Sequence, residues 1–201
     1  MPNNLVKLKN HVKKLHDCKA CPKMIGPVVS GPAILSKVIL VGQAPGPREG
    51  EFGKPFAWTA GKTLFKWMDE CGQSEESFRE KVYMAAVCRC FPGKNPKGGD
   101  RVPNETEILN CSSWFEKECS LLEPGLIIPV GKLAINQFLS FKKLTEVVGS
   151  SHQVKLKHGT VDLIPLPHPS GASTWHRTEP GIGLLKKALG LVKKHPCWKN
   201  L

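Results

Sequence analysis

The sequence lacks a long apolar run. None of its hydrophobic stretches approaches the roughly 20 residues that a membrane-spanning helix needs. Residues 1–5 lead into a lysine-rich amphipathic segment without the apolar core of an export signal. We therefore expect a soluble monomer of the cytoplasm with no membrane partner. Internal repeats, low-complexity tracts and Gly/Ser-rich linkers are also absent, so residues 1–201 are interpreted as one domain.

Acidic residues are scarce relative to basic ones. The chain has 17 Asp and Glu against 29 Lys and Arg, a formal net charge of +12 on 201 residues. Such an excess favours a polyanionic partner, although many basic soluble proteins bind nothing anionic. Hydrophobic residues make up 40% of the chain and charged residues 23%, which is typical of a globular domain and argues against disorder or a coiled coil. Charge alone therefore leaves nucleic-acid binding open.

The spacing of apolar residues predicts an α/β fold. Leu5, Leu8, Val12 and Leu15 mark an amphipathic helix that ends near Asp17, and a similar stripe over 184–192 marks the last helix. Between them, short apolar runs at 38–42, 82–87, 126–130 and 161–166 are typical of buried strands. Helical patterns at 60–71, 104–122 and 132–138 separate these runs. Alternating strands and helices predict a parallel sheet.

Unusual residues follow each predicted strand. In open parallel sheets, ligands bind at the carboxyl ends of the strands. The segments found there are Gln43-Ala-Pro-Gly46, Cys88-Arg-Cys-Phe-Pro92, Gly131-Lys132 and Pro167-His-Pro-Ser-Gly171. We expect them to meet on one rim of the sheet and to form an active site.

The chain carries eight cysteines, and without an export signal metal ligation is a more plausible use for them than disulfide bonding. Cys18 and Cys21 have the two-residue gap that lets two thiolates bind one metal centre. Cys90 and Cys111 are our choice for the other two ligands, with Cys88 as an alternative to Cys90. Four sulfur ligands suit zinc and an iron–sulfur cluster equally well on chemistry alone.

Several motifs in order along the chain resemble the uracil-DNA glycosylase superfamily, most closely its iron–sulfur branch, families 4 and 5. They are Cys18-Lys-Ala-Cys21, Val41-Gly-Gln-Ala-Pro-Gly46, Gly53-Lys-Pro-Phe-Ala-Trp-Thr-Ala-Gly61, Ala85-Ala-Val-Cys-Arg-Cys-Phe-Pro-Gly-Lys-Asn95, Glu107-Ile-Leu-Asn-Cys111, Gly131-Lys-Leu-Ala134 and Leu166-Pro-His-Pro-Ser170. The resemblance implies a three-layer α/β/α sandwich with a four-stranded parallel sheet. It also implies a structural [4Fe–4S] cluster on the four chosen cysteines. The implied activity is the flipping of uracil or another deaminated base out of DNA and cleavage of its N-glycosidic bond during base excision repair.

The resemblance also implies roles for individual residues. Phe56 would stack on the flipped base, and His168 would stabilise the carbonyl oxygen that gains charge as the bond breaks. Residues that would contact DNA phosphates are Pro45, Gly46, Ser170 and Gly171. Trp175 would enter the duplex, and Arg177 would contact a phosphate or the minor groove. Further basic candidates near the predicted rim are Lys94, Lys97 and Arg101.

Two positions depart from the family pattern. Gln43 stands where family 4 usually carries an acid, and Ala86 stands near its usual Asn. Gln43 can orient water or the base edge but cannot accept a proton at neutral pH. A carboxylate elsewhere would have to do so, and the candidates are Glu49, Glu51 and Asp100.

Two other functions remain open at this stage. The first is a noncatalytic binder of uracil-containing or single-stranded DNA on the same fold, which turnover on a uracil oligonucleotide would exclude. The second is a zinc-stabilised α/β protein with an unrelated small-molecule activity, which the visible absorbance of anaerobically purified protein would test.

Overall fold

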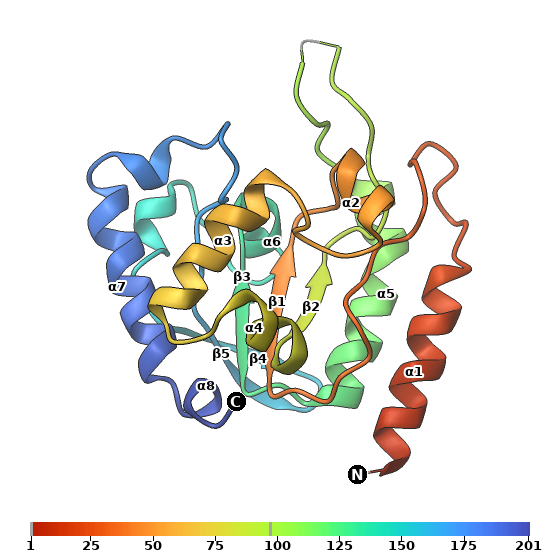
Figure 1. Cartoon of the computed structure of the whole chain (residues 1–201), viewed down its shortest axis with the longest axis horizontal. Helices are drawn as coiled ribbons and strands as arrows, with labels where there is room; N and C mark the ends of the chain where they lie inside the picture. The colour runs from red at the N-terminus through yellow and green to blue at the C-terminus, as the bar shows by residue number, and fades with distance from the viewer. Residues whose placement is uncertain (1, 97) are drawn as a thin grey trace.

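The computed structural model describes residues 2–96 and 98–201 and has the alternating order that the sequence predicts (Figure 1). Its strands are β1 (Val38–Gly42), β2 (Tyr83–Ala86), β3 (Leu126–Pro129), β4 (His152–Leu156) and β5 (Gly159–Leu163). Its helices are α1 (Pro2–His16), α2 (Pro47–Phe52), α3 (Thr59–Glu70), α4 (Glu75–Lys81), α5 (Glu105–Leu122), α6 (Lys132–Asn136), α7 (Gly181–Lys194) and α8 (Pro196–Lys199). Two short 3₁₀ helices cover Leu144–Glu146 and Trp175–Arg177.

The sheet has five strands in the order β2-β1-β3-β5-β4. All four predicted strands are present and parallel to their neighbours, and β4 pairs with β5 in antiparallel orientation at the edge. The prediction of a four-stranded sheet therefore missed the fifth strand, β4. Half-buried Val154 and Leu156 alternate along β4 with exposed Gln153 and Lys155, so this strand lacks the continuous apolar run of a buried one.

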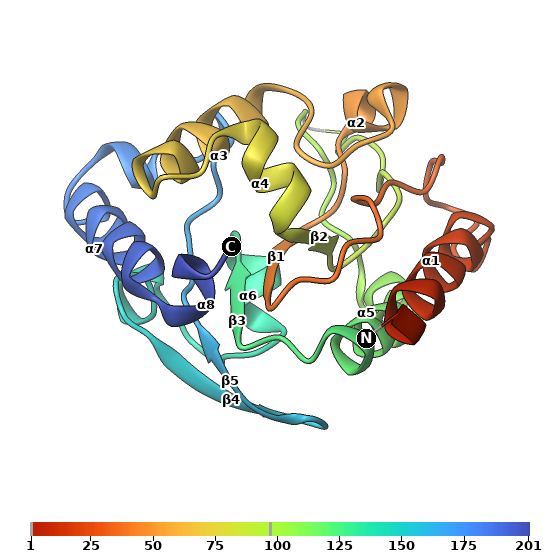
Figure 2. The ribbon, with the colours of Figure 1, turned by 60° about the horizontal axis from the view of Figure 1, so that its bottom comes forward.

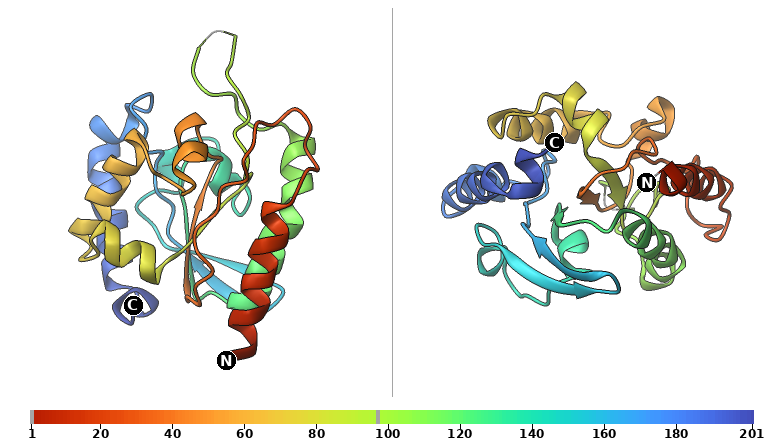
Figure 3. Two further views of the ribbon diagram at one scale, coloured as in Figure 1. Left: turned by 45° about the vertical axis from the view of Figure 1, so that its right-hand side comes forward. Right: turned by 90° about the horizontal axis from the view of Figure 1, so that it is seen from below.

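Helices cover both faces of the sheet and make three layers, as expected (Figures 2 and 3). Alternate residues of β1 point to opposite faces, with Val38 and Leu40 in one core and Ile39 and Val41 in the other. Helices α3, α4, α7 and α8 lie over the first core. Helices α1 and α5 lie side by side over the second, where Leu8 of α1 is fully buried.

The loops at the carboxyl ends of the strands gather at one edge of the sheet. Strand β1 lies between β2 and β3, so the connections that follow these strands diverge to opposite sides of β1. This divergence opens a crevice above the carboxyl end of β1. The segment between β2 and α5 rises above this edge as a long hairpin in which Lys94 and Asp100 form an antiparallel bridge (Figure 1). None of the helices in the described part of the chain is long and apolar enough to cross a membrane.

Candidate active site

A pocket of about 610 Å³ opens above the carboxyl ends of β1 and β2. This volume lies within the range of small-molecule sites and would admit a single nucleobase. It is lined by Gln43, His168 and Ser170 from the predicted rim, by Phe56, and by the carboxylates Glu49 and Asp100. Residues more than 120 positions apart in the sequence thus meet at one site, as predicted from the strand ends.

Phe56 is held in a conformation that few residues adopt. Its φ angle of 52° is left-handed, which is costly for a bulky side chain. Arg79 stabilises the turn by donating hydrogen bonds to the carbonyls of Pro55 at 2.9 Å and Phe56 at 3.2 Å. Gly61 lets helix α3 approach, because a side-chain carbon there would lie 1.8 Å from the Phe56 carbonyl oxygen. The ring lies against Gly42 at the end of β1, so it is positioned before any ligand arrives.

The His168 ring is fixed in one tautomer. Its Nδ1 atom accepts a hydrogen bond from the Ser170 backbone amide at 3.2 Å, which leaves the proton of the neutral ring on Nε2. Gly131 lies directly against the ring, since a side-chain carbon at that position would be 2.9 Å from His168 Cδ2. The neutral His168 ring, which lines the pocket, therefore carries its hydrogen-bond donor on Nε2.

Burial lowers the pKa of His168 below its ordinary value of 6.5, and the charge of His176 acts in the same direction, while Asp100 opposes both. We expect an NMR titration of the His168 ring to show a midpoint below 6.5, so that the ring is neutral at pH 7. Replacing Asp100 by Asn removes the opposing charge and should move the midpoint further down. A midpoint at or above 6.5 in the wild-type protein would contradict this assignment.

Two carboxylates converge on Gly46 in the first loop. A side-chain carbon on Gly46 would lie 2.9 Å from Glu49 Oε2 and 3.5 Å from Asp100 Oδ2. Glu49 is only 8% exposed, and its Oε2 accepts the Gly46 amide hydrogen at the start of α2. Asp100 reaches the pocket from the hairpin, where its Oδ1 pairs with Lys94 at 2.6 Å. Glu51, the third candidate, instead forms an exposed ion pair with Arg48 at 2.7 Å and does not line the pocket.

The four cysteines chosen from the sequence are neighbours in space. Burial, and after it the neighbouring thiols of Cys111, Cys18 and Cys21, together raise the pKa of the Cys90 thiol to about 11, so the four thiols lie close enough to affect one another. Cys88 is fully buried and donates a hydrogen bond to Cys111, which lowers the pKa of Cys111. Within residues 2–96 and 98–201, no three ligating side chains are already arranged around one point as in a formed metal site. The donor set nevertheless fits a four-thiolate centre, because the four sulfurs come from three segments that meet at one place.

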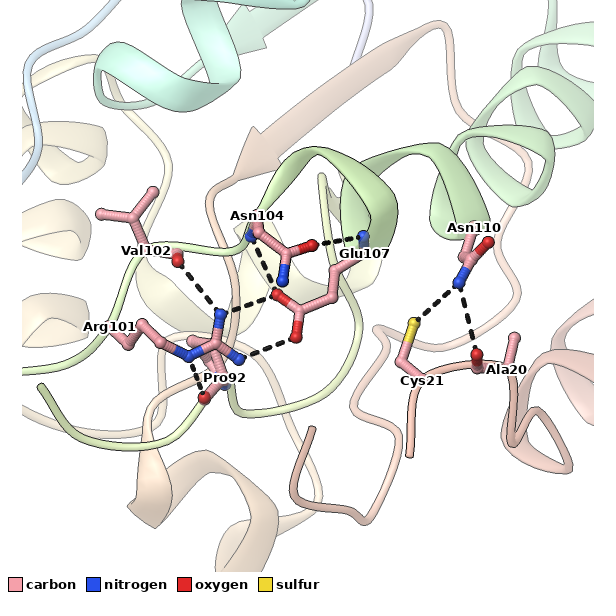
Figure 4. Close-up of polar contacts among 8 residues, drawn as sticks. All are labelled: Ala20, Cys21, Pro92, Arg101, Val102, Asn104, Glu107 and Asn110. Carbon is pink, nitrogen blue, oxygen red and sulfur yellow. Dashed lines mark hydrogen bonds and ion pairs between the residues drawn. The ribbon is translucent and has the colours of Figure 1, made fainter. Parts of the chain in front are cut away.

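The first turns of α5 tie the hairpin to the cysteine loop (Figure 4). Arg101 donates to both carboxylate oxygens of Glu107 at 2.8 Å and to the Pro92 carbonyl at 2.8 Å, which closes the base of the hairpin. One turn later, Asn110 donates to the Cys21 sulfur at 3.6 Å. Helix α5 therefore contacts both the base of the hairpin that carries Asp100 and the loop that carries Cys21.

Comparison with known proteins agrees with this geometry. Residues 29–189 match the model of the uracil DNA glycosylase superfamily. The chain belongs to this superfamily. It is 29% identical to the type-4 uracil-DNA glycosylase of Sulfurisphaera tokodaii over 85% of this chain and 76% of the relative. The type-4 enzyme of Thermotoga maritima is also 29% identical, over 79% of each chain. The type-5 enzyme of Pyrobaculum aerophilum is 24% identical over 75% of this chain and 74% of the relative.

Not every residue predicted from the superfamily motifs lies at the pocket. Pro45 and Gly46 do line it, whereas Gly171, Trp175 and Arg177 do not. Trp175 is half-buried and packs against the core beside Gly181.

The basic candidates divide in the same way. Arg177 is exposed and therefore accessible to DNA, whereas Arg101 is occupied by Glu107 and is a structural clamp rather than a free phosphate ligand. Lys94 lines the pocket but pairs with Asp100, and Lys97 lies outside the described residues.

Three residues at this site were not predicted from the sequence motifs. Arg79 donates a hydrogen bond to the Phe56 carbonyl from the short helix α4. This helix has no apolar stripe from which the sequence could predict it. Arg48 and Trp58 line the mouth of the pocket. Trp58 lies within the motif that contains Phe56, two residues after it and directly before α3, and this place in the motif is the signal that could have identified it.

Proposed function

We propose that this protein is a DNA glycosylase that removes uracil or another deaminated base from DNA. The observation that carries the proposal is that the left-handed Phe56, the neutral His168 and a pair of carboxylates share one base-sized pocket. In the reaction, a water oxygen bonds to the sugar C1′ while the bond from C1′ to the base nitrogen breaks. The electron pair of that bond leaves with the base, and the products are a free base and an abasic sugar.

Each side chain contributes to one part of this reaction. Phe56 stacks on the flipped base, a contact that contributes about 1–3 kcal/mol. The Nε2 proton of His168 stabilises the carbonyl oxygen of the departing base as it gains negative charge. A carboxylate accepts the proton of the attacking water and stabilises the positive charge that develops on the sugar, and Gln43 orients the water or the base edge. Asp100 is our choice for the proton acceptor, because Lys94 engages its Oδ1 and not the Oδ2 that faces Gly46, whereas the Glu49 oxygen that faces Gly46 already accepts the Gly46 amide hydrogen.

The decisive experiment is an abasic-site assay on oligonucleotides that contain uracil, hypoxanthine or xanthine, each in single-stranded and duplex form. The proposal expects alkali-labile sites and free base from at least one of them. Tight binding of a uracil oligonucleotide without any cleavage would instead support the noncatalytic binder on the same fold.

We further propose a [4Fe–4S] cluster on Cys18, Cys21, Cys90 and Cys111. The type-4 relatives and the meeting of these four thiols support it. When bound, the cluster would supply structural cross-links among the N-terminal loop, the segment after β2 and helix α5. The Gln43 carbonyl accepts the Cys88 amide hydrogen at 3.0 Å, so this cysteine segment borders the pocket without entering the chemistry.

Iron analysis tests the ligand set. Anaerobically purified wild-type protein should contain about four iron atoms per chain and absorb visible light. Cys90→Ser should lose most of the iron, because a hydroxyl is a poor replacement for a thiolate as an iron ligand. Cys88→Ser should keep the iron, as should Cys197→Ser, whose thiol lies near Asp162 and Lys37 instead. Zinc in place of iron, or an intact chromophore in Cys90→Ser, would overturn the assignment.

We propose that residues 1–201 act as one domain, as a monomer, on DNA in the cytoplasm. The net charge of +12 supports binding to a polyanion.

A further inference from the structure

Two exposed aromatic side chains lie next to each other beside the pocket, and one of them lines it. Phe52, at the end of α2, is 52% exposed, and Trp58, directly before α3, is 46% exposed. They are the only aromatic residues among the large apolar side chains that are exposed in the described part of the chain. Trp58 follows Phe56 by two residues and lines the pocket itself. Exposed apolar surface of this kind, beside a candidate active site, indicates a contact with a ligand.

The two rings form an ordered stack. Their centroids are 6.1 Å apart and their planes differ by 21°. The Arg48 guanidinium lies 5.4 Å from the centroid of the Trp58 ring, where a cation is attracted to the ring face. Arg48 also pairs with Glu51 at 2.7 Å, and both of these side chains are more than half exposed. We call Phe52, Trp58 and Arg48 the aromatic platform.

The chemistry of the platform matches a nucleotide. Aromatic rings stack on nucleobases of any sequence, and a neighbouring arginine can bind the phosphate that follows. Stacking requires a base with a free face. In a duplex, flipping uncovers only the face toward the vacated position, and the adjacent base stays paired and stacked on its other side, so the platform suits a base in a single strand or in a locally opened helix. Trp175 is half-buried against the core, whereas Trp58 is 46% exposed and lines the pocket.

We propose that the aromatic platform stacks on the unpaired base adjacent to the flipped nucleotide, and that the protein therefore prefers single-stranded DNA over a closed duplex. This inference rests on the proposed function for the presence of DNA at the pocket. It goes further by naming the form of the substrate and a subsite next to the one that holds the damaged base. The stacked base would lie beyond Phe56, on the side of the pocket formed by α2 and the start of α3.

Binding to modified oligonucleotides tests the platform without requiring cleavage. The probe is a fluorescent single strand with one 2′-fluoro-deoxyuridine, a uracil nucleotide whose glycosidic bond resists hydrolysis. Companion strands carry a tetrahydrofuran abasic residue immediately 5′ or 3′ of it, and a complementary strand provides the duplex. Fluorescence anisotropy then gives an affinity for each probe.

We expect removal of the flanking base and removal of the Trp58 ring to lower the affinity by similar factors. Removing the flanking base on one side should weaken wild-type binding about 5- to 150-fold, the affinity change that corresponds to one stacked base. Trp58→Ala should lose a similar factor on the intact strand and should no longer respond to that abasic residue. Trp58→Phe should retain most of the affinity, and Phe52→Ala should give an intermediate loss. Wild-type protein should bind the single strand more tightly than the duplex.

Controls separate this inference from a folding defect and from the proposed function. Leu35, 45% exposed just before the amino end of β1, provides a matched variant, Leu35→Ala, that should bind like wild type. Circular dichroism establishes that each variant is folded. Equal affinity of the wild type for all three single strands, tighter binding of the duplex, or a full abasic response in Trp58→Ala would each overturn the platform. Failure of the cleavage assay with the flanking-base effect intact would count against the glycosylase alone.

Discussion

Replacement of His168 by alanine is expected to lower the rate of base release about 10²–10³-fold while leaving the affinity for uracil DNA largely unchanged. This is the scale for removing one preorganised donor that faces a developing negative charge. The split between rate and affinity follows because the hydrogen bond strengthens only as the base departs. His168 is well suited to this role, since its tautomer is set by the Ser170 amide and its burial keeps the ring neutral.

Single-turnover cleavage rates and anisotropy measurements of binding provide the two readouts. His158→Ala is the matched control, because this histidine lies at the turn between β4 and β5 and contacts the Pro124 carbonyl rather than the pocket. Equal losses of rate and affinity in His168→Ala would indicate that the ring mainly binds the ground state, and a rate close to wild type would remove His168 from the mechanism.

Replacement of Asp100 by asparagine is expected to lower base release about 10²–10⁴-fold, the range for loss of a positioned general base. Asp100 is delivered to the pocket by the hairpin that the Arg101–Glu107 pair closes, and its Oδ2 faces Gly46 beside Glu49. Asparagine keeps the shape of the side chain but cannot accept the proton of the attacking water. Glu49→Gln should have a smaller effect on the rate, because its Oε2 caps the start of α2.

A second substitution makes this prediction specific. Gln43→Glu restores the usual family acid, so it should recover activity in the Asp100→Asn background and change little in the wild type. The control is Glu116→Gln. Glu116 lies on α5, where it forms an exposed ion pair with Lys157 and does not line the pocket, so this change should leave the rate unchanged. Full activity in Asp100→Asn, together with a large loss in Glu49→Gln, would transfer the role of proton acceptor to Glu49.

The local patterns in the sequence predicted most of the fold correctly. Runs of buried apolar residues identified β1, β2, β3 and β5, because parallel strands covered on both faces need continuous hydrophobicity. The half-exposed strand β4 was missed for the same reason. The short helices α2, α4 and α8, of six, seven and four residues, also escaped, since a helix of one or two turns is too short to show a periodic stripe.

What the sequence determined by itself is the set of residues that chemistry needs: the cysteine pair at chelate spacing, the histidine held between two prolines, and the absence of an acid at Gln43. Membership of the uracil DNA glycosylase superfamily follows from such motifs and is confirmed. The tertiary structure decided which carboxylates reach the pocket. Glu49 and Glu51 are two residues apart on one helix, yet only Glu49 turns inward, and Asp100 arrives from a distant hairpin. It also decided that Trp175 is half-buried against the core while Trp58 is 46% exposed. Such choices depend on packing between segments remote in the chain, where burial and the available partners, rather than residue type, set the direction of each side chain.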